Sequence, residues 1–322
     1  MARKKIRYRS VSDMCNRVTE SLGTFPQDLD MVVGIPRSGM IAATLITLYR
    51  NLPMTDLDGL FEGRMIKSGR RSIEQINSEG RKCKALVVDD SVGAGTQMRA
   101  ARERLKSLED RFEFVFTAVY VSEEGASLVD LPMEVCPQPR VFQWNVMNHY
   151  LMQRACVDVL ALLRSDVAGE AVRQSRLPDL FEQTPFFKPK YKLGSLVVPA
   201  EPSQREQVES WMDSHGLSCE HLVLAGKSWQ MYAKARRVAQ RERSVRMAFV
   251  FERAEACRSA EAAGVPVFSS QSFELCQPSA FACARYRLRR IPYGLKRRLG
   301  ILSDQESMPA GANEITPPVN AD

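Results

Sequence analysis

Short apolar runs alternate with amphipathic stretches along the first 150 residues. The apolar runs are bounded by glycine or polar residues, which is typical of buried strands, and the amphipathic stretches have helical spacing. The first helix opens on Ser10, a residue type that caps helices, and the helix at 40–49 is apolar enough to be buried. Strands are predicted at 31–33, 85–88 and 112–121, and helices at 10–22, 40–49 and 97–108. Residues 54–82 are polar and weakly periodic, which predicts a mobile loop over much of this stretch.

The alternation resumes after His149. Strands are predicted at 155–159, 193–198, 221–224, 247–251 and 265–268, and helices at 203–215, 232–243 and 254–263. Strands that alternate with helices predict parallel sheets covered on both faces, and therefore an α/β, Rossmann-like fold class. At roughly 100–200 residues per domain, the 322 residues fit two domains. We predict one α/β domain over 1–150, a second over 151–284, and a basic segment with a disordered tail over 285–322.

Composition narrows the class of protein. Hydrophobic residues make up 44% and charged residues 26%, as in soluble globular proteins. No apolar run reaches the ~18–20 residues of a membrane-spanning helix, and the basic stretch Met1–Arg9 has no apolar run behind it, so no secretory signal is expected. The eight cysteines include no Cys-x-x-Cys pair and the three histidines complete no zinc spacing. We therefore expect a cytoplasmic protein with reduced thiols.

The net charge of +7 has a local source. Seven Lys and Arg residues and no acid lie within 285–298, so the rest of the chain is neutral. Aromatic and aliphatic residues such as Tyr286 and Ile291 are interleaved with these cations. Three interpretations stay open: a solvated cap on the second domain, a segment that lies peripherally on an anionic membrane, or a nucleic-acid contact.

The main chemical pattern is the stretch Val87–Gln97, Val-Val-Asp-Asp-Ser-Val-Gly-Ala-Gly-Thr-Gln. A predicted strand delivers Asp89 and Asp90 to its end, and a turn of small residues and a helix follow. Small side chains let backbone N–H groups converge on an anion, and the start of the helix adds partial positive charge. Carboxylates beside such a cradle suit a ligand with both a phosphate and a diol, because acidic oxygens accept hydrogen bonds from hydroxyls. An ordinary turn with a helix cap is the plainer alternative.

This segment resembles the phosphoribosyl-pyrophosphate (PRPP) motif of type I phosphoribosyltransferases. The resemblance implies that Asp89 and Asp90 bind the ribose hydroxyls, take part in catalysis and contact Mg²⁺, directly or indirectly. It also implies that the loop binds the 5-phosphate, through Ser91, Val92, Gly93, Ala94, Gly95, Thr96 and Gln97. The sequence departs from the family where Gly93 and Ala94 replace hydroxyl residues and Gln97 replaces a threonine. Backbone donors survive these changes, whereas some side-chain donors are lost.

Two upstream segments agree with this resemblance. Residues 32–41 look like the family's pyrophosphate loop, which implies pyrophosphate binding by Pro36, Arg37, Ser38 and Gly39. Residues 63–71 look like its flexible basic loop, which implies phosphate contacts from Lys67, Arg70 and Arg71 and exclusion of water on closure. A solvated basic surface is the alternative for this second segment. For Phe142 and Trp144, near the end of the first domain, packing at the domain junction is favoured over stacking on a nucleobase.

The second half resembles haloacid-dehalogenase (HAD)-like phosphatases. Asp158 stands where that family has its nucleophile, but Leu160 replaces the general acid and Ala161 replaces a glycine. The strand at 193–198 lacks the expected hydroxyl residue at its end, and Glu252 is followed by Arg253 instead of a second acid. A lone carboxylate cannot provide both the nucleophile and the proton transfer. We therefore expect a degenerate HAD-like domain without phosphatase activity and with a structural, dimerising or regulatory role, including a homodimer.

Taken together, the resemblances imply a Mg²⁺-dependent phosphoribosyltransferase that transfers ribose phosphate from PRPP to a small-molecule acceptor such as a nucleobase. The residues leave the acceptor open. A non-catalytic regulator that senses PRPP or a nucleotide and reaches RNA or a protein through its basic tail is the alternative. A membrane-associated step in surface-glycan assembly is a third hypothesis, which depends on the basic tail and on analogy of fold.

Overall fold

The computed structural model describes residues 5–66, 81–163, 165–174, 179–242 and 244–289. The chain divides into two compact units. One comprises Met1–Met152, Phe187–Lys192 and Phe273–Leu275, and the other comprises Gln153–Phe186, Leu193–Ser272 and Cys276–Asp322. The sequence predicted an uninterrupted second domain over 151–284. The two short segments assigned to the first unit have no composition that sets them apart from their neighbours.

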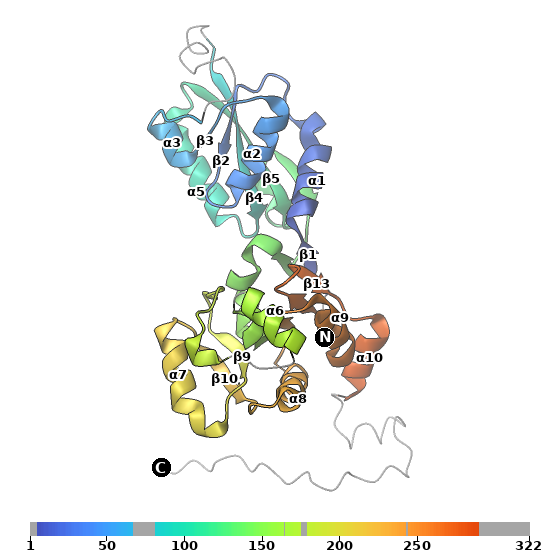
Figure 1. Cartoon of the computed structure of the whole chain (residues 1–322). Helices are drawn as coiled ribbons and strands as arrows, with labels where there is room; N and C mark the ends of the chain where they lie inside the picture. The colour runs from blue at the N-terminus through green and yellow to red at the C-terminus, as the bar shows by residue number, and fades with distance from the viewer. Residues whose placement is uncertain (1–4, 67–80, 164, 175–178, 243, 290–322) are drawn as a thin grey trace, which may run out of the picture. The chain divides into compact units, whose positions relative to one another are not determined.

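The first unit contains a parallel sheet with strand order β3-β2-β4-β5-β6 (Figure 1). The strands are β2 (Met31–Gly34), β3 (Met54–Asp56), β4 (Cys83–Val92), β5 (Phe112–Val121) and β6 (Leu131–Val135). A separate parallel pair joins β1 (Arg7–Arg9) to β7 (Arg140–Phe142). The predicted parallel α/β fold of this unit is confirmed.

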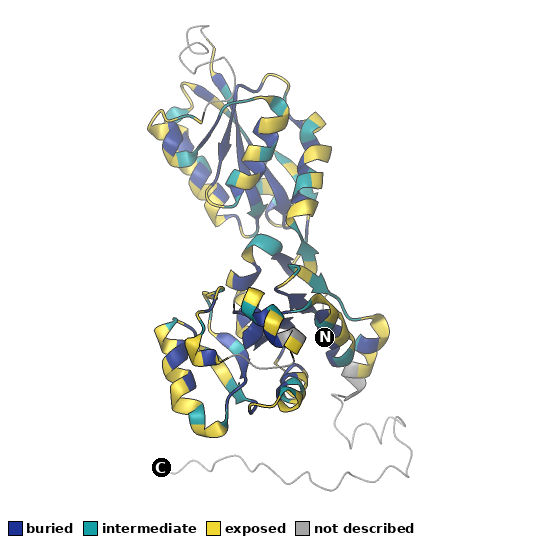
Figure 2. Cartoon of the chain, viewed as in Figure 1, coloured by how far each residue is buried: buried dark blue, intermediate teal, exposed yellow. Residues whose placement is uncertain are grey.

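Helices cover both faces of this sheet. They are α1 (Val11–Ser21), α2 (Gly39–Arg50), α3 (Leu57–Phe61) and α5 (Thr96–Leu105). Because side chains alternate along a strand, Val87 faces the cluster that includes Met98 of α5, whereas Leu86 faces the cluster that includes Met14 of α1 and Ile46 of α2. The buried strands between the helices are dark in Figure 2.

Three local predictions for this unit concern the cap of α1, the burial of α2 and the start of the loop after residue 54. Ser10 caps α1 as predicted, in a capping box with Asp13. The helix predicted to be buried at 40–49 is buried on one face only: Ala42, Ala43 and Ile46 of α2 lie in the core, whereas Leu48 and Tyr49 are 74% and 59% exposed. The loop predicted from residue 54 begins too early, because 54–61 form β3 and α3; the Asp56 side chain accepts a hydrogen bond from the Gly59 N–H and so caps α3.

A further sheet has the strand order β10-β9-β8-β11-β12-β13, and its registered pairs are parallel. It belongs to the second unit except for Glu274 and Leu275 of β13. Its strands are β8 (Ala155–Asp158), β9 (Leu193–Val198), β10 (Cys219–Leu224), β11 (Met247–Val250), β12 (Val267–Ser269) and β13 (Glu274–Cys276). Its helices are α6 (Ser165–Gln174), α7 (Arg205–Ser214), α8 (Trp229–Ala239), α9 (Arg253–Ala263) and α10 (Ala280–Arg289). The alternation of strands and helices follows the prediction, with α6, β13 and α10 in addition.

The expectation of reduced thiols is wrong for one pair, because Cys257 of α9 and Cys276 of β13 form a disulfide. Nineteen positions separate the two residues in sequence, so no short cysteine motif marks them. Cys15, Cys83, Cys136, Cys156, Cys219 and Cys283 are free thiols. Over the described part of the chain, no helix has the length and apolarity needed to cross a bilayer.

Candidate active site at the carboxyl end of strand β4

Strand β4 carries both predicted carboxylates. It runs from Cys83 to Val92, so it does not end at Val88 as the sequence suggested. Asp89, Ser91 and Val92 pair with residues of the equally long strand β5, which extends β4 through the acidic pair. The polar residues therefore stand on the rigid sheet. The turn that follows is limited to 93–95.

Asp90 joins three segments of the first unit. Its Oδ1 accepts a hydrogen bond of 2.6 Å from the Ser38 hydroxyl, and its Oδ2 accepts one of 2.8 Å from the Trp144 indole N–H. Ser38 precedes α2, and Trp144 lies in the short 3₁₀ helix Gln143–Asn148. The structure thus brings the predicted pyrophosphate loop against the predicted ribose carboxylate. It also adds Trp144, for which no contact with Asp90 was predicted.

Asp89 is buried, as is Asp90. Its Oδ1 accepts a hydrogen bond of 2.8 Å from the Asp90 backbone N–H. Burial raises the pKa of the Asp89 carboxyl above its ordinary value, and the neighbouring Asp90 raises it further. No Lys or Arg forms an ion pair with either aspartate within the described ranges. The pair therefore holds negative charge that a ligand or a cation can neutralise.

The turn that follows β2 lies close to β4 because it contains a glycine. A Cβ atom on Gly39 would stand 2.7 Å from the Val88 carbonyl oxygen and 3.0 Å from Asp89 Cα, so a larger residue would push this turn away from the strand. The Ile35 N–H also donates to the Val88 carbonyl at 2.8 Å. Pro36 and Arg37 are exposed, which leaves the tip of the turn accessible to a ligand.

The candidate phosphate loop leads into the N-terminus of α5. Gly95 is the N-cap with φ +78°, and a Cβ atom there would clash with Leu128, so both backbone and space favour glycine. No side chain caps the helix, and Ala94, Thr96 and Gln97 are exposed. The first backbone N–H groups of α5 are therefore open to an anion. Val92, by contrast, is part of the core, so only its backbone is placed near the loop.

Arg140 supplies a buried cation that sequence reasoning missed. It is 4% exposed, and its Nη1 donates to the carbonyl oxygens of Tyr120 and Cys136 at 3.3 and 3.2 Å. Its Nη2 would lie 3.6 Å from a Cβ atom on Gly93, which places the guanidinium beside the loop. Burial lowers the pKa of Arg140, partly offset by the charges of Cys136, Asp90 and Asp89. Within the described ranges no carboxylate forms an ion pair with Arg140, so the site has a positive charge suited to an anion.

Trp144 belongs to an aromatic stack inside the first unit. Its ring lies on Phe142 with centroids 4.9 Å apart and planes 7° apart, and Phe142 lies on Tyr120 at 5.3 Å. The stack fixes the indole, so that its N–H points at Asp90. The favoured expectation of packing at a domain junction does not describe these contacts, because the partners of Phe142 and Trp144 in the stack and at Asp90 all lie in the first unit.

A cavity of about 730 Å³ opens beside the loop. Gly93 and Ala94 line one side of it, and Ser122, Glu123 and Glu124 line another, just past the end of β5. The cavity also touches Lys5, Arg7, Pro137 and Gln138. Space for a small molecule therefore adjoins the predicted phosphate loop.

Some predicted contacts lie outside the described residues. These are Lys67, Arg70 and Arg71 of the predicted flexible loop, and most of the basic segment 285–298. Within the described ranges, no cluster of three His, Cys, Asp or Glu residues offers a ready metal site. A cation at Asp89 and Asp90 would need further ligands from its substrate.

The acidic residue of the second unit has a different environment. Asp158 is the last residue of β8, and its side chain is fully buried. Its Oδ2 forms an ion pair of 2.6 Å with Arg236 Nη1, while its Oδ1 accepts from the Tyr232 hydroxyl and, at 2.9 Å, from the Leu160 N–H. Burial would lower the pKa of Arg236, but Asp158 and Glu255 outweigh it and hold that pKa above its ordinary value. Both oxygens of Asp158 are therefore engaged within the protein.

The first unit has a parallel α/β sheet, with an acidic pair and a candidate phosphate loop at the carboxyl end of a central strand. This arrangement is typical of proteins that bind phosphorylated ligands at that edge of the sheet. No family model matches the chain. Over 125 residues, however, it is 31% identical to the xanthine-guanine phosphoribosyltransferase of Chromohalobacter salexigens, a span of 38% of this chain and 68% of that relative. The chain belongs to the phosphoribosyltransferase family.

A second curated relative has a different role. The transcriptional regulator GfcR of Methanococcoides burtonii is 30% identical over 132 residues, or 39% of this chain and 63% of that protein. Solved structures with similarity include the xanthine-guanine-hypoxanthine phosphoribosyltransferase of Helicobacter pylori, at 16% identity and a TM-score of 0.35, covering 45% of this chain and 95% of that one. The purine phosphoribosyltransferase of Pyrococcus horikoshii gives 15% identity and a TM-score of 0.33, covering 44% and 94%.

Proposed function

We propose that the first unit transfers a phosphoribosyl group from PRPP to a nucleobase, with a purine as the first candidate. The observation that carries the proposal is the acidic pair at the end of β4, with Asp90 bonded to Ser38 of the upstream turn and the open start of α5 after it. The similarity to a xanthine-guanine phosphoribosyltransferase supports the same chemistry and the purine acceptor.

Each part of the site then has a task. Asp89 and Asp90 bind the ribose hydroxyls, the backbone N–H groups of 93–97 bind the 5-phosphate, and the turn at 36–39 binds the pyrophosphate. Arg140 lies beside Gly93 and compensates the negative charge of the ligand. A buried cation without a carboxylate partner favours an anion nearby. Positioning and electrostatics supply most of the catalysis, since the protein forms no covalent intermediate.

The reaction breaks the bond between ribose C1 and the pyrophosphate oxygen and forms a bond from C1 to an acceptor nitrogen, which loses its proton. One of the two acids, Asp89 or Asp90, takes up this proton in its ionised form. Two carboxylates with no third protein ligand in the described ranges fit Mg²⁺ that shares substrate oxygens, the usual mode for this ion. When bound, Mg²⁺ would neutralise charge on the departing pyrophosphate. Trp144 holds Asp90, and its ring stack offers an aromatic surface for the acceptor.

For the second unit we propose a HAD-like fold that has lost phosphatase activity. The parallel sheet and the position of Asp158 at the end of β8 support the likeness. The ion pair with Arg236 and the hydrogen bond from Tyr232 support the loss, because they occupy the oxygens a nucleophile would use. We expect no Mg²⁺-dependent hydrolysis of p-nitrophenyl phosphate.

Pyrophosphate release tests the transferase. The full chain is incubated with PRPP, Mg²⁺ and each of a panel of purine and pyrimidine bases. We expect turnover with at least one base and a loss of about 10²–10³-fold in Asp90→Asn, because a group that orients charge in the transition state is removed. The exposed Asp213→Asn is the matched control and should keep wild-type turnover. Absence of turnover with every base would contradict the proposal.

A second candidate function is a regulator that binds PRPP without turnover. The 30% identity to GfcR is the observation that favours it. The loop agrees with it, because Gly93 and Ala94 replace hydroxyl residues and side-chain donors for the phosphate are lost. PRPP binding without pyrophosphate release, together with salt-sensitive binding of RNA, would select this function over the transferase.

A further inference from the structure

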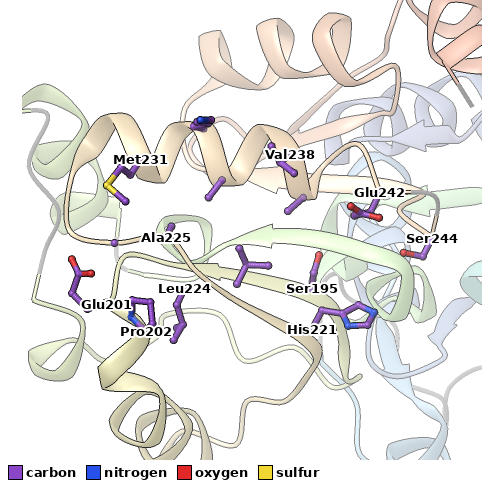
Figure 3. A pocket seen from close by; sticks show the side chains of 15 residues that line it. Ser195, Glu201, Pro202, His221, Leu224, Ala225, Met231, Val238, Glu242 and Ser244 are labelled. Carbon is purple, nitrogen blue, oxygen red and sulfur yellow. The ribbon is translucent and has the colours of Figure 1, made fainter. Parts of the chain in front are cut away.

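The second unit contains a cavity of about 790 Å³ (Figure 3). One wall is a face of α8 on which Met231, Ala235, Val238 and Ala239 recur at helical spacing. The floor is formed by strands β9 and β10, and Val223 of β10 belongs to it. Its volume lies within the roughly 300–1,000 Å³ of small-molecule sites, which are mostly apolar with a few placed polar groups.

The apolar wall is incompletely covered by the protein. Met231 and Val238 are 57% and 55% exposed although they line a hollow. A ligand that covers these apolar side chains removes them from water, and this burial stabilises the complex by roughly 25 cal/mol per Å². The wall therefore favours an occupant with an apolar body.

One end of the cavity is polar. Ser195 of β9 and His221 of β10 are register partners, so their side chains stand next to each other on one face of the sheet. Glu242 and Ser244 lie at the same end, whereas Glu201 and Met231 lie at the other (Figure 3).

Ser195 has a buried hydroxyl beside this cavity. It is 6% exposed, and its hydroxyl makes no hydrogen bond of normal geometry. Its polar neighbour is the Cys156 thiol, which is its register partner on β8 and a weak hydrogen-bonding group. A buried hydroxyl without a full partner is costly, and a polar ligand atom at this end would remove the cost.

We infer that this cavity binds a small amphipathic molecule with a flat or extended apolar body and an uncharged or cationic head that donates hydrogen bonds, such as an amine or an alcohol. The body lies along α8, and the head lies at Ser195 and His221. Two carboxylates, Glu201 and Glu242, and one ammonium group, Lys234, line the cavity, so acids outnumber cations in its lining and disfavour an anionic head. This site lies in the second unit and is independent of the proposed transferase.

The test is fluorescence titration of the full chain with 1-aminoanthracene, a flat apolar body with an amine. We expect saturable binding at one site, and binding at least fivefold weaker for the anionic probe 1-anilinonaphthalene-8-sulfonate. Ala235→Trp fills the cavity and should weaken 1-aminoanthracene at least tenfold. Ser195→Ala should weaken it about fivefold, the effect of one hydrogen bond.

The matched control is Ala254→Trp, the same substitution at an exposed position of α9 outside the cavity, which should bind like wild type. If circular dichroism shows that Ala235→Trp does not fold, Val238→Lys replaces it with the same expected loss, because position 238 is half-exposed and tolerates lysine. No saturable binding, wild-type affinity in the folded cavity variant, or tighter binding of the anionic probe would each overturn the inference.

Discussion

Both units place an aspartate near the carboxyl end of a parallel strand, but they treat its charge differently. Asp158 at the end of β8 is fully buried and has its own cation, Arg236, at 2.6 Å. Asp90 in β4 accepts hydrogen bonds from two neutral donors, Ser38 and Trp144, and the described chain gives it no ion pair. The first carboxylate is neutralised from within, whereas the second keeps its charge for a partner.

An acid at the end of a strand is therefore not sufficient to mark a functional site. A carboxylate whose oxygens are engaged by a buried cation has a structural role, because breaking such a pair is costly. A carboxylate held by neutral donors stays oriented and remains available to a cation or to hydroxyl groups. Substitutions in the two environments should therefore have opposite signatures: one should affect stability, the other function.

Loss of the cation in the second unit should have the largest effect. Arg236→Met leaves Asp158 buried and unpaired, so we expect a loss of about 3–5 kcal/mol in the free energy of unfolding of this unit. Thermal unfolding followed by circular dichroism measures it. Arg237→Met, the same substitution at the exposed neighbour, should change it by less than about 0.5 kcal/mol. Equal effects from both variants would show that the Asp158 pair is not structural.

Loss of the indole N–H in the first unit should come next. Trp144→Phe keeps a ring on Phe142 but removes the donor to Asp90, so we expect kcat/KM for PRPP to fall about tenfold while stability is nearly unchanged. The control is Trp229→Phe in the second unit. A variant with unchanged kcat/KM and unchanged pH profile would mean that Trp144 does not position Asp90.

The last prediction concerns the way Asp89 makes stability depend on pH. Its pKa is raised in the folded state by burial and by Asp90, so between the ordinary pKa of an aspartate, about 4, and the raised value, the folded state holds a proton that the unfolded chain has released. The free energy of unfolding should therefore fall as pH rises through this window, by at most about 1.4 kcal/mol per pH unit. Asp89→Asn should remove this fall, whereas the exposed Asp213→Asn should keep it. Urea unfolding at several pH values measures the slopes, and identical slopes in wild type and Asp89→Asn would contradict the assignment.

Several strands and the acidic residues of the candidate site could be predicted from the sequence. Runs such as 112–121 and 193–198 gave strands with correct bounds, because a buried parallel strand is a continuous apolar segment between polar boundaries. The acidic pair and the glycine turn also stood out, since their chemistry depends on neighbours in the sequence.

Long-range contacts could not be predicted in the same way. Arg140 lies far along the chain from Gly93, and nothing in its own stretch indicates that its guanidinium is buried beside the loop. The Trp144 bond to Asp90 spans 54 positions, and the Arg236 bond to Asp158 spans 78. The local signals were a tryptophan and an arginine near the end of the first domain, and a basic helix in the second. Such residues more often serve packing or solubility.

Calorimetric titration of PRPP with Mg²⁺ into the full chain tests the central claim, that the acidic pair of β4 binds the ribose of this donor. We predict saturable binding to wild type, at least tenfold weaker binding to Asp90→Asn, no detectable binding to the double variant Asp89→Asn with Asp90→Asn, and wild-type affinity for Asp213→Asn. Equal affinity in wild type and the double variant would contradict the claim.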